Sequence, residues 1–351
     1  MKIEKSELVQ KLNKLKSIVP KRPSVEALEG VLVKDGYLIA NNLEVLVKAK
    51  LKGVEDNETF IIPERSFDLI NNLPEGEMEI IAGTKNTVGI KSVQIKNTYK
   101  SVDPINFPLP DISSKNGGQI TIKSETLLES MKKVSYAIAS QSTREPAKAL
   151  CLDASGNILN FVGFDGYMLA WDKVDFEGEF ELLIPKTTVE KLLSIGLTGD
   201  VAINYNEYGV LFVTDDYEVY TRVIDGSYFA YKNMIKEMPL QATVDRKSLL
   251  NALIRTKMCA KELSVARFDF NDNQLNISIN EDTVDYNETV YLKNSLGADL
   301  LIGFNPRFVI ETLKSFDCDE IKLSFTSAKV PMLVEDKNSN FKAVIAPVTL
   351  K

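Results

Sequence analysis

The stretch "KSELVQKLNKLKSIV" (residues 5–19) occurs in three related forms along the chain and decides the fold. The other two are "KSETLLESMKKVSYAIA" (123–139) and "DRKSLLNALIRTKMCA" (245–260). In each, apolar residues recur at the spacing of an amphipathic helix, and the leading residues Leu8, Leu127 and Leu249 lie about 120 residues apart. Each stretch follows a short alternating run, "MKIE", "QITI" or "QATV", which predicts a strand. The chain is therefore predicted to contain three similar units.

A second element repeats at the same interval. The stretches "FIIPERSFDLINNLPEG" (60–76), "LLIPKTTVEKLLSIGLTG" (182–199) and "LLIGFNPRFVIETLKSFD" (300–317) each predict an apolar strand followed by a helix. Pro63 and Pro185 are expected to open their helices, and Ser6 and Ser124 are expected to cap the first helix of their units. Alternating runs between these helices predict half-buried strands. The predicted fold class is α+β, with domains at residues 1–117, 118–239 and 240–351, each having two helices packed on antiparallel sheets.

Composition excludes several classes of function. The 351 residues include no histidine, which excludes Ser-His-Asp catalysis and histidine-based zinc sites. No Gly-rich phosphate loop is present. The three cysteines, Cys151, Cys259 and Cys318, are expected to be reduced and to pack as small hydrophobic groups. We therefore expect no metal and no cofactor, and the sequence predicts neither a signal peptide nor a membrane span.

The net charge of −7 argues against binding nucleic acid by overall charge. Basic residues nevertheless recur on the repeated helices: Lys11, Lys14, Lys132, Lys133, Lys191, Arg246 and Arg255. One interpretation is a solvated helix face with mixed charge. The other is that equivalent helices of three repeats form one basic surface, which would bind phosphates without reading base sequence.

The order of several motifs resembles one known family over the whole chain. The motifs are "IIPERSFDLINNLPEGEMEI", "INFPLPD", "FDGYMLA", "YTRVIDGSYFAY", "DNQLNI", "IGFNPRFV" and "VIAPVTL". Together they resemble the bacterial sliding clamp, the beta subunit of DNA polymerase III. The resemblance implies a head-to-tail homodimeric ring of six like domains that encircles double-stranded DNA and has no catalytic activity. It also implies several partners: a polymerase of the DNA polymerase III alpha or PolC type, a clamp loader and other proteins with clamp-binding motifs. The expected location is the cytoplasm, on the nucleoid.

The stretch "FDGYMLAW" (164–171) places large apolar residues around a predicted Asp-Gly turn. The resemblance implies that this segment helps to form a hydrophobic pocket for short peptide motifs, while the competing interpretation for Leu169 and Val344 is ordinary core packing. The deep part of the implied pocket is Leu169, Phe229, Met234, Val344 and Ala346. The shallow part is Ala147, Phe164, Gly166, Tyr167 and Met168, and the flanking residues are Asn305, Phe308, Pro331, Pro347, Val348 and Leu350. Asn233 and Ile345 are also assigned to the pocket.

The resemblance also implies two further contact regions. Arg22 and Gln141 match positions that approach DNA, although a surface arginine with no partner is an equal alternative for Arg22. Tyr99 in the first domain and Met258 in the third match a dimer interface, and each could instead belong to the core of its own domain.

Two other functions are compatible with three repeats. One is an interaction scaffold that shares the fold and does not bind DNA. The other is an enzyme with paired carboxylates, since glycosidase-like chemistry needs no histidine. Whether the basic residues of the repeated helices line one cavity distinguishes a clamp from a scaffold.

Overall fold

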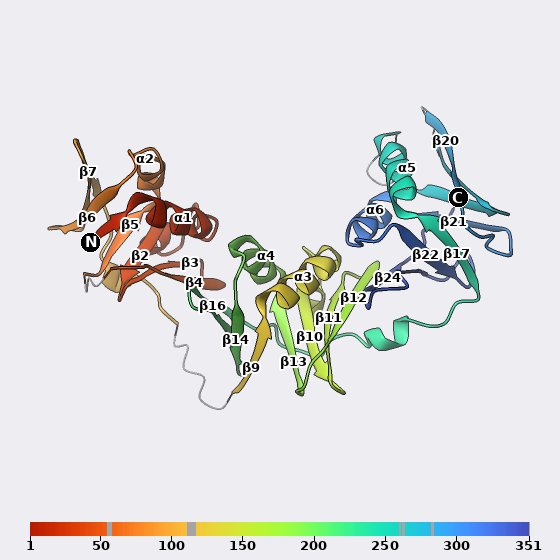
Figure 1. Ribbon diagram of the computed structural model, residues 1–351, viewed down its shortest axis with the longest axis horizontal. Helices are drawn as coiled ribbons and strands as arrows, with labels where there is room; N and C mark the ends of the chain where they lie inside the picture. Colours follow the sequence, from red (N-terminus) through yellow and green to blue (C-terminus); the bar gives the residue numbers. More distant parts are fainter. Residues whose placement is uncertain (55–57, 111–116, 260, 262–263, 282–283, 351) are drawn as a thin grey trace. The chain divides into compact units, whose positions relative to one another are not determined.

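The order of helices and strands repeats three times in a computed structural model that describes residues 1–54, 58–110, 117–259, 261, 264–281 and 284–350 (Figure 1). Each repeat runs strand, helix, three strands, a further strand, helix, three strands, as the sequence predicts. The domain limits at 117 and 239 remain a prediction.

The first repeat comprises β1 (Lys2–Glu4), α1 (Lys5–Lys16), β2 (Gly30–Lys34), β3 (Tyr37–Asn41), β4 (Val45–Lys50), β5 (Phe60–Pro63), α2 (Phe67–Asn71), β6 (Glu77–Gly83), β7 (Thr87–Ser92) and β8 (Ile95–Lys100). The second comprises β9 (Gly118–Lys123), α3 (Ser124–Val134), β10 (Ala149–Ser155), β11 (Ile158–Phe164), β12 (Met168–Asp175), β13 (Phe180–Pro185), α4 (Lys186–Ile195), β14 (Asp200–Tyr205), β15 (Gly209–Val213) and β16 (Tyr217–Arg222). The third comprises β17 (Leu240–Asp245), α5 (Arg246–Cys259), β18 (Ala266–Asn271), β19 (Gln274–Glu281), β20 (Val284–Tyr291), β21 (Leu300–Phe304), α6 (Pro306–Lys314), β22 (Glu320–Phe325), β23 (Met332–Glu335) and β24 (Lys342–Ile345).

The chain forms two compact units, each built from parts of two repeats. Unit 1 contains residues 1–128 and 187–223, and unit 2 contains residues 129–186 and 224–351. Unit 1 has an eight-stranded sheet of order β5-β2-β3-β4-β16-β15-β14-β9 and a four-stranded sheet of order β1-β6-β7-β8. Unit 2 has an eight-stranded sheet of order β13-β10-β11-β12-β24-β23-β22-β17 and a four-stranded sheet of order β20-β19-β18-β21. All the strand pairs in these sheets are antiparallel.

Each eight-stranded sheet joins four strands of one repeat to four of the next. In unit 1 the joint is the pairing of β4 with β16, and in unit 2 it is the pairing of β12 with β24. Backbone hydrogen bonds therefore cross the boundary between repeats, which is why the compact units differ from the predicted domains.

Apolar side chains on the helices and strands form the cores of both units. On α1, Leu8, Leu12 and Leu15 are at most 1% exposed, as the helical spacing predicts. In unit 2, Leu169 and Val344 belong to a buried cluster that also contains Cys151 and Tyr231. This cluster lies under the turn that carries the candidate site.

The ends of three helices differ from the sequence prediction. The residue before α1 is Glu4, which makes no side-chain capping bond, so the predicted role of Ser6 is wrong. Pro63 and Pro185 end β5 and β13 and so do not open the helices. In the third repeat Asn305 caps α6, because its side chain accepts a hydrogen bond from the Arg307 N–H.

Candidate functional site

The turn between β11 and β12 is fixed by one carboxylate. Asp165 Oδ1 accepts the backbone N–H groups of Tyr167 and Met168 at 2.8 and 2.7 Å. Burial raises the pKa of Asp165 above its usual value, and these hydrogen bonds partly offset the effect. Gly166 has φ +97°, a backbone conformation that favours glycine, and no other residue lies within 4 Å of the position that a Cβ atom would take there. The turn therefore holds Tyr167 outward, with 64% of its surface exposed.

Exposure divides the predicted pocket residues into two groups. Leu169 and Val344 are 1% and 6% exposed and face each other across the β12–β24 joint. Ala147, Met168 and Ile345 are also buried. The partly or fully exposed residues are Phe164, Gly166, Tyr167, Phe229, Asn233, Met234, Asn305, Phe308, Pro331, Ala346, Pro347, Val348 and Leu350. Two of the predicted deep residues, Leu169 and Val344, are therefore covered by surrounding side chains.

Aromatic rings form a continuous chain behind the turn. Phe164 contacts Phe229 edge to face, with ring centroids 4.9 Å apart. Phe229 contacts Tyr228 at 5.2 Å, Tyr228 contacts Tyr231 at 6.5 Å, and Tyr231 contacts Trp171 at 5.2 Å. This chain of five rings runs from the exposed turn into the core of unit 2.

Hydrogen bonds hold the three inner rings of this chain. Tyr228 donates to the Val162 carbonyl at 3.2 Å, and Tyr231 donates to Asp153 Oδ2 at 2.5 Å. Trp171 Nε1 donates to Asn160 Oδ1 at 2.9 Å. Burial raises the pKa of Tyr228 well above its usual value, so its hydroxyl is a neutral donor at physiological pH.

The third repeat supplies the opposite side of the site. Phe308 on α6 stacks on Tyr167 with centroids 5.9 Å apart and an interplanar angle of 28°. The Ala346 N–H donates to the Tyr167 carbonyl at 2.8 Å, and the Val348 N–H donates to the Gly303 carbonyl at 2.8 Å. The C-terminal segment is therefore bound along unit 2, and the site combines an exposed Tyr167–Phe308 platform with a covered interior.

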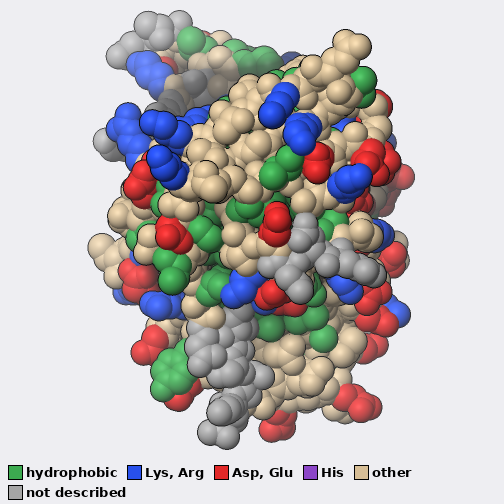
Figure 2. All heavy atoms as spheres, turned by 90° about the vertical axis from the view of Figure 1, so that its left-hand side faces the viewer, with side chains coloured by type: hydrophobic (Ala, Val, Ile, Leu, Met, Phe, Trp, Pro, Cys, Tyr) green, Lys and Arg blue, Asp and Glu red, His purple; other side chains and the backbone are tan. Residues whose placement is uncertain are grey.

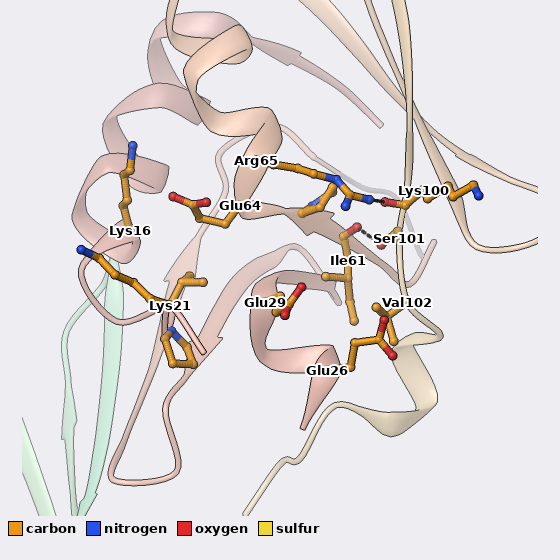
Figure 3. A pocket seen from close by; sticks show the side chains of 13 residues that line it. Lys16, Lys21, Glu26, Glu29, Ile61, Glu64, Arg65, Lys100, Ser101 and Val102 are labelled. Carbon is orange, nitrogen blue, oxygen red and sulfur yellow. Dashed lines mark hydrogen bonds between the residues drawn. The ribbon is translucent and has the colours of Figure 1, made fainter. Parts of the chain in front are cut away.

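A separate cavity of about 640 Å³ lies in unit 1 (Figure 3). Its apolar wall includes Ile61 and Val102, and the charged side chains on its rim are Lys16, Lys21, Glu26, Glu29, Glu64, Arg65 and Lys100. Ser101 Oγ donates to the Ile61 carbonyl at 2.6 Å across this cavity. The mixed charge favours no single class of ligand, so this cavity is not a candidate for the principal function.

Most of the predicted DNA-facing cations already have partners within the chain. The expectation of an exposed group is wrong for Lys11, which is 4% exposed and lies 3.6 Å from Asp216 and 4.4 Å from the centre of the Tyr217 ring. Lys14 donates to the Ile195 carbonyl, and Lys191 donates to the Ser17 carbonyl at 2.7 Å.

In unit 2, Lys133 lies 3.7 Å from Asp172, and Arg255 pairs with Glu288 through two hydrogen bonds. Arg246 donates to the carbonyl groups of Cys318 and Leu313, near the C-terminal end of α6. Arg22, Lys132 and Gln141 are exposed. On the face drawn in Figure 2, cationic and acidic side chains both lie at the surface and are interspersed.

Two of the edge strands in the described sheets, β8 and β20, stand in places where the other repeats are joined to a neighbour. β8 is the last strand of the four-stranded sheet of unit 1, and every one of its residues except Tyr99 is exposed. β20 is the first strand of the four-stranded sheet of unit 2. In the other repeats, β16 and β24 stand in the place of β8, and β4 and β12 stand in the place of β20. All four of these strands are paired with a strand of a neighbouring repeat. Met258, near the end of α5, is 79% exposed.

Comparisons with known proteins identify the family. The model of the DNA polymerase III beta subunit central domain matches residues 121–229, and that of the C-terminal domain matches residues 236–349. These segments cover more than half of the chain. The chain belongs to the DNA polymerase III beta subunit family. This is the family of the sliding clamps, the non-catalytic processivity subunits of that polymerase.

Relatives share the whole length at low identity. The beta sliding clamp of Chlamydia muridarum is 24% identical, covering 99% of this chain and 98% of its own, and that of Escherichia coli K12 is 22% identical, covering 99% of each. Among solved structures, the sliding clamp of Pseudomonas aeruginosa bound to griselimycin has a TM-score of 0.93 at 21% identity, covering 100% of this chain and 99% of its own. The beta subunit of Thermotoga maritima has a TM-score of 0.90 at 24% identity, with the same coverage. The clamp fold therefore extends over the full chain.

Several features of this clamp's site were not identified from sequence. Trp171 lies 57 and 60 residues before Tyr228 and Tyr231 in the chain, and only the fold brings the three rings together. The available signal was Trp171, the single tryptophan of the chain, beside the apolar turn. No described helix has the length and apolar character needed to cross a membrane, and the described residues contain no group of three or more side chains suited to binding a metal ion.

Proposed function

We propose that this chain acts as a DNA sliding clamp: two copies close head to tail into a ring around double-stranded DNA. The observation that carries the proposal is the pair of unpaired edges on β8 and β20, in a chain whose corresponding strands are paired at both internal joints. Because an open edge exposes backbone donors and acceptors, a second copy that pairs β8 with β20 would satisfy both edges at once.

Charge on the two edges supports this pairing. β8 carries Lys96 and Lys100, while β20 carries Asp285 and Glu288. At the internal joint of unit 1, Lys48 on β4 and Glu218 on β16 are 2.8 Å apart. If two copies pair in the register of this joint, Lys96 lies opposite Asn287, so the opposite charges of the two strands would favour their approach without forming the equivalent ion pair. Tyr99 and Met258 are the residues we assign to this interface.

We further propose that Arg22, Lys132 and Gln141 face the DNA, together with the outer ends of Lys14, Lys133, Lys191, Arg246 and Arg255. Contacts of this kind bind phosphates without sequence preference and weaken as salt rises. A ring needs only weak contacts, since topology keeps it on the DNA. The proposed location is the bacterial cytoplasm.

The site around Tyr167 is proposed to bind short peptide motifs of partner proteins. The partners are a replicative polymerase of the alpha or PolC type, the clamp loader and other proteins with such motifs. The exposed Tyr167–Phe308 platform supports this role, because aromatic surface beside a few polar groups is typical of peptide-binding sites.

The decisive experiment is retention on circular compared with linear DNA. The chain, a clamp loader and ATP are mixed with nicked circular DNA, and bound protein is separated by gel filtration before and after the circle is cut. A ring is retained on the circle and lost after cutting, and a dimer that is never retained would support the scaffold function instead.

The peptide site is tested separately with an aromatic substitution. Tyr167→Ala is expected to weaken binding of polymerase-tail peptides at least about tenfold in calorimetry, since exposed aromatic anchors carry much of such binding energy. Tyr208→Ala is the matched control, because Tyr208 is 70% exposed and lies in unit 1. Equal losses in the two variants would remove the assignment of the site.

A further inference from the structure

The interior of the peptide site is closed by two phenylalanine rings. Phe164 lies opposite Leu169 across the β11–β12 pairing and packs on the buried cluster that contains Leu169 and Val344. Phe229 contacts the Phe164 ring at an interplanar angle of 73°. The two residues that a deep anchor would touch, Leu169 and Val344, are 1% and 6% exposed.

The Phe229 ring is held from both sides. It contacts Phe164 at 4.9 Å and Tyr228 at 5.2 Å, both edge to face. Tyr228 is itself fixed by its hydrogen bond to the Val162 carbonyl. Because Phe229 lies between two rings, a ligand that displaces it must break two aromatic contacts.

Unit 1 differs from unit 2 at the end of the corresponding strand. Asn41 lies opposite Leu46 at the end of β3, as Phe164 lies opposite Leu169 at the end of β11. The following turns match as well, since Asn42 Oδ1 accepts two backbone N–H groups in the same pattern as Asp165 Oδ1.

In unit 1 the residue at the end of the strand is polar, and one ring, Phe107, lies in the buried cluster that contains Leu46. Asn41 Nδ2 donates to the Pro108 carbonyl at 2.7 Å and so ties the end of β3 to the segment that follows β8. In unit 2 the Phe164–Phe229 contact ties the end of β11 to the segment that follows β16. Unit 1 thus closes this place with one buried ring and one hydrogen bond, whereas unit 2 adds a second ring, Phe164.

We infer that the Phe164–Phe229 pair is a specificity determinant: it restricts the anchor side chain of a bound peptide to small aliphatic groups and excludes aromatic anchors. This inference rests on the proposed peptide site and names the class of peptide that it accepts. Phe164 packs on the buried cluster that contains Leu169 and Val344, and Phe229 packs on Phe164, so an aromatic anchor would have to displace both rings, whereas a Val or Leu side chain needs less room beside them.

The test uses a random hexapeptide phage library selected on the full-length protein. Wild type, Phe229→Ala and Phe164→Leu are compared, the last because it removes the ring and keeps an apolar side chain over the core. Phe176→Ala is the matched control. Phe176 and Phe180 form a similar edge-to-face pair away from the site, with ring centroids 6.0 Å apart. The selected peptides are then tested for binding to the Tyr167→Ala variant, and loss of binding confirms that they bind at this site.

The wild type and the control are expected to select Val or Leu at the anchor, and both site variants are expected to select Phe or Trp. A Phe-anchored peptide should bind Phe229→Ala at least about tenfold more tightly than wild type in calorimetry. Aromatic anchors selected equally by the wild type would overturn the inference and leave the peptide site intact. If no variant selects peptides that depend on Tyr167, the proposed peptide site itself fails.

Discussion

A disulfide between two copies tests the proposed ring closure at a single pair of residues. At the joint in unit 1, Lys48 on β4 lies opposite Glu218 on β16, and their side chains are 2.8 Å apart. If two copies pair β20 with β8 in the register of this joint, the corresponding residues are Asn287 and Lys96. Replacing both with cysteine should link the copies.

The strand pairings establish this correspondence. Lys48 lies opposite Ile39 in the β3–β4 hairpin, and Asn287 lies opposite Ser278 at the same step of β19–β20. On the other side, Glu218 lies opposite Val213 in β15–β16, and Lys96 lies opposite Lys91 at the same step of β7–β8. The joint of unit 2 follows the same register, with Trp171 opposite Lys342.

The expected distances separate the correct register from an incorrect one. Opposite residues of an antiparallel pair have Cα atoms about 4.5–5.5 Å apart, within the range of about 4.4–6.8 Å that a disulfide spans. A shift of two residues displaces one Cα atom by about 6.8 Å along the strand, so the Cα–Cα distance becomes about 8.5 Å, which is too long for a disulfide. Lys96→Cys with Asn287→Cys should therefore crosslink, and Thr98→Cys with Asn287→Cys should not.

The assay is non-reducing electrophoresis after mild oxidation. Cys259 and Cys318 are replaced by serine in both variants because they are partly exposed, and the buried Cys151 is kept. Gel filtration of the reduced proteins shows whether each variant is dimeric. The reasoning is refuted if the shifted pair links as readily as the aligned pair, or if the aligned pair stays unlinked in a protein that is dimeric.

Three further predictions concern stability and DNA binding. Tyr231→Phe removes the hydrogen bond to Asp153 and should lower the free energy of unfolding by about 1.5–3 kcal/mol, measured by urea titration of Trp171 fluorescence; an unchanged midpoint would contradict it. Burial raises the pKa of Glu335, but hydrogen bonds from Lys322 and Lys342 outweigh this effect and hold the pKa below its usual value. The contribution of this carboxylate to stability is therefore present above about pH 4.3 and is lost as the pH falls. Glu335→Gln should therefore destabilise the protein at pH 7 and have less effect near pH 3, and an equal effect at both values would be inconsistent with this pairing. Lys132→Gln should weaken binding to a short open duplex and reduce the salt dependence of that binding, because one phosphate contact is lost, whereas Lys11→Met should change neither, because Lys11 is buried beside Asp216; equal losses in the two variants would contradict this assignment.

The sequence predicts the repeat and the order of elements because apolar periodicity survives in every copy. The spacing of Leu8, Leu127 and Leu249 is enough to place the three leading helices, all of which the structure contains. Local chemistry at element ends is less predictable. Pro63 follows an apolar run and precedes a helix, yet its backbone continues the strand, since tertiary pairing with Gly30 extends β5 to that residue.

Side-chain partners account for the larger failures at the candidate sites. Lys11 has the same sequence neighbourhood as Lys14, and only the fold shows that Lys11 is buried against residues 216 and 217, about 200 positions away. Likewise, the sequence places Phe164 and Phe229 65 residues apart and gives no sign that their rings touch. Periodicity reports which face of an element is apolar, and it carries no information about which distant residue meets that face.

The two open edges require an explanation beyond the single chain. β8 has six residues and β20 has eight, and exposed edges of this length promote uncontrolled strand pairing unless they are covered or blocked. Val93 beside β8 and Tyr291 at the end of β20 are 87% and 72% exposed, and β8 contains no proline. Charge is the only blocking device present on β8, and it is opposite in sign to that of β20. An edge that repels copies of itself and attracts the other edge permits head-to-tail pairing and disfavours β8–β8 or β20–β20 contacts, so the distribution of charge selects a closed ring over aggregates.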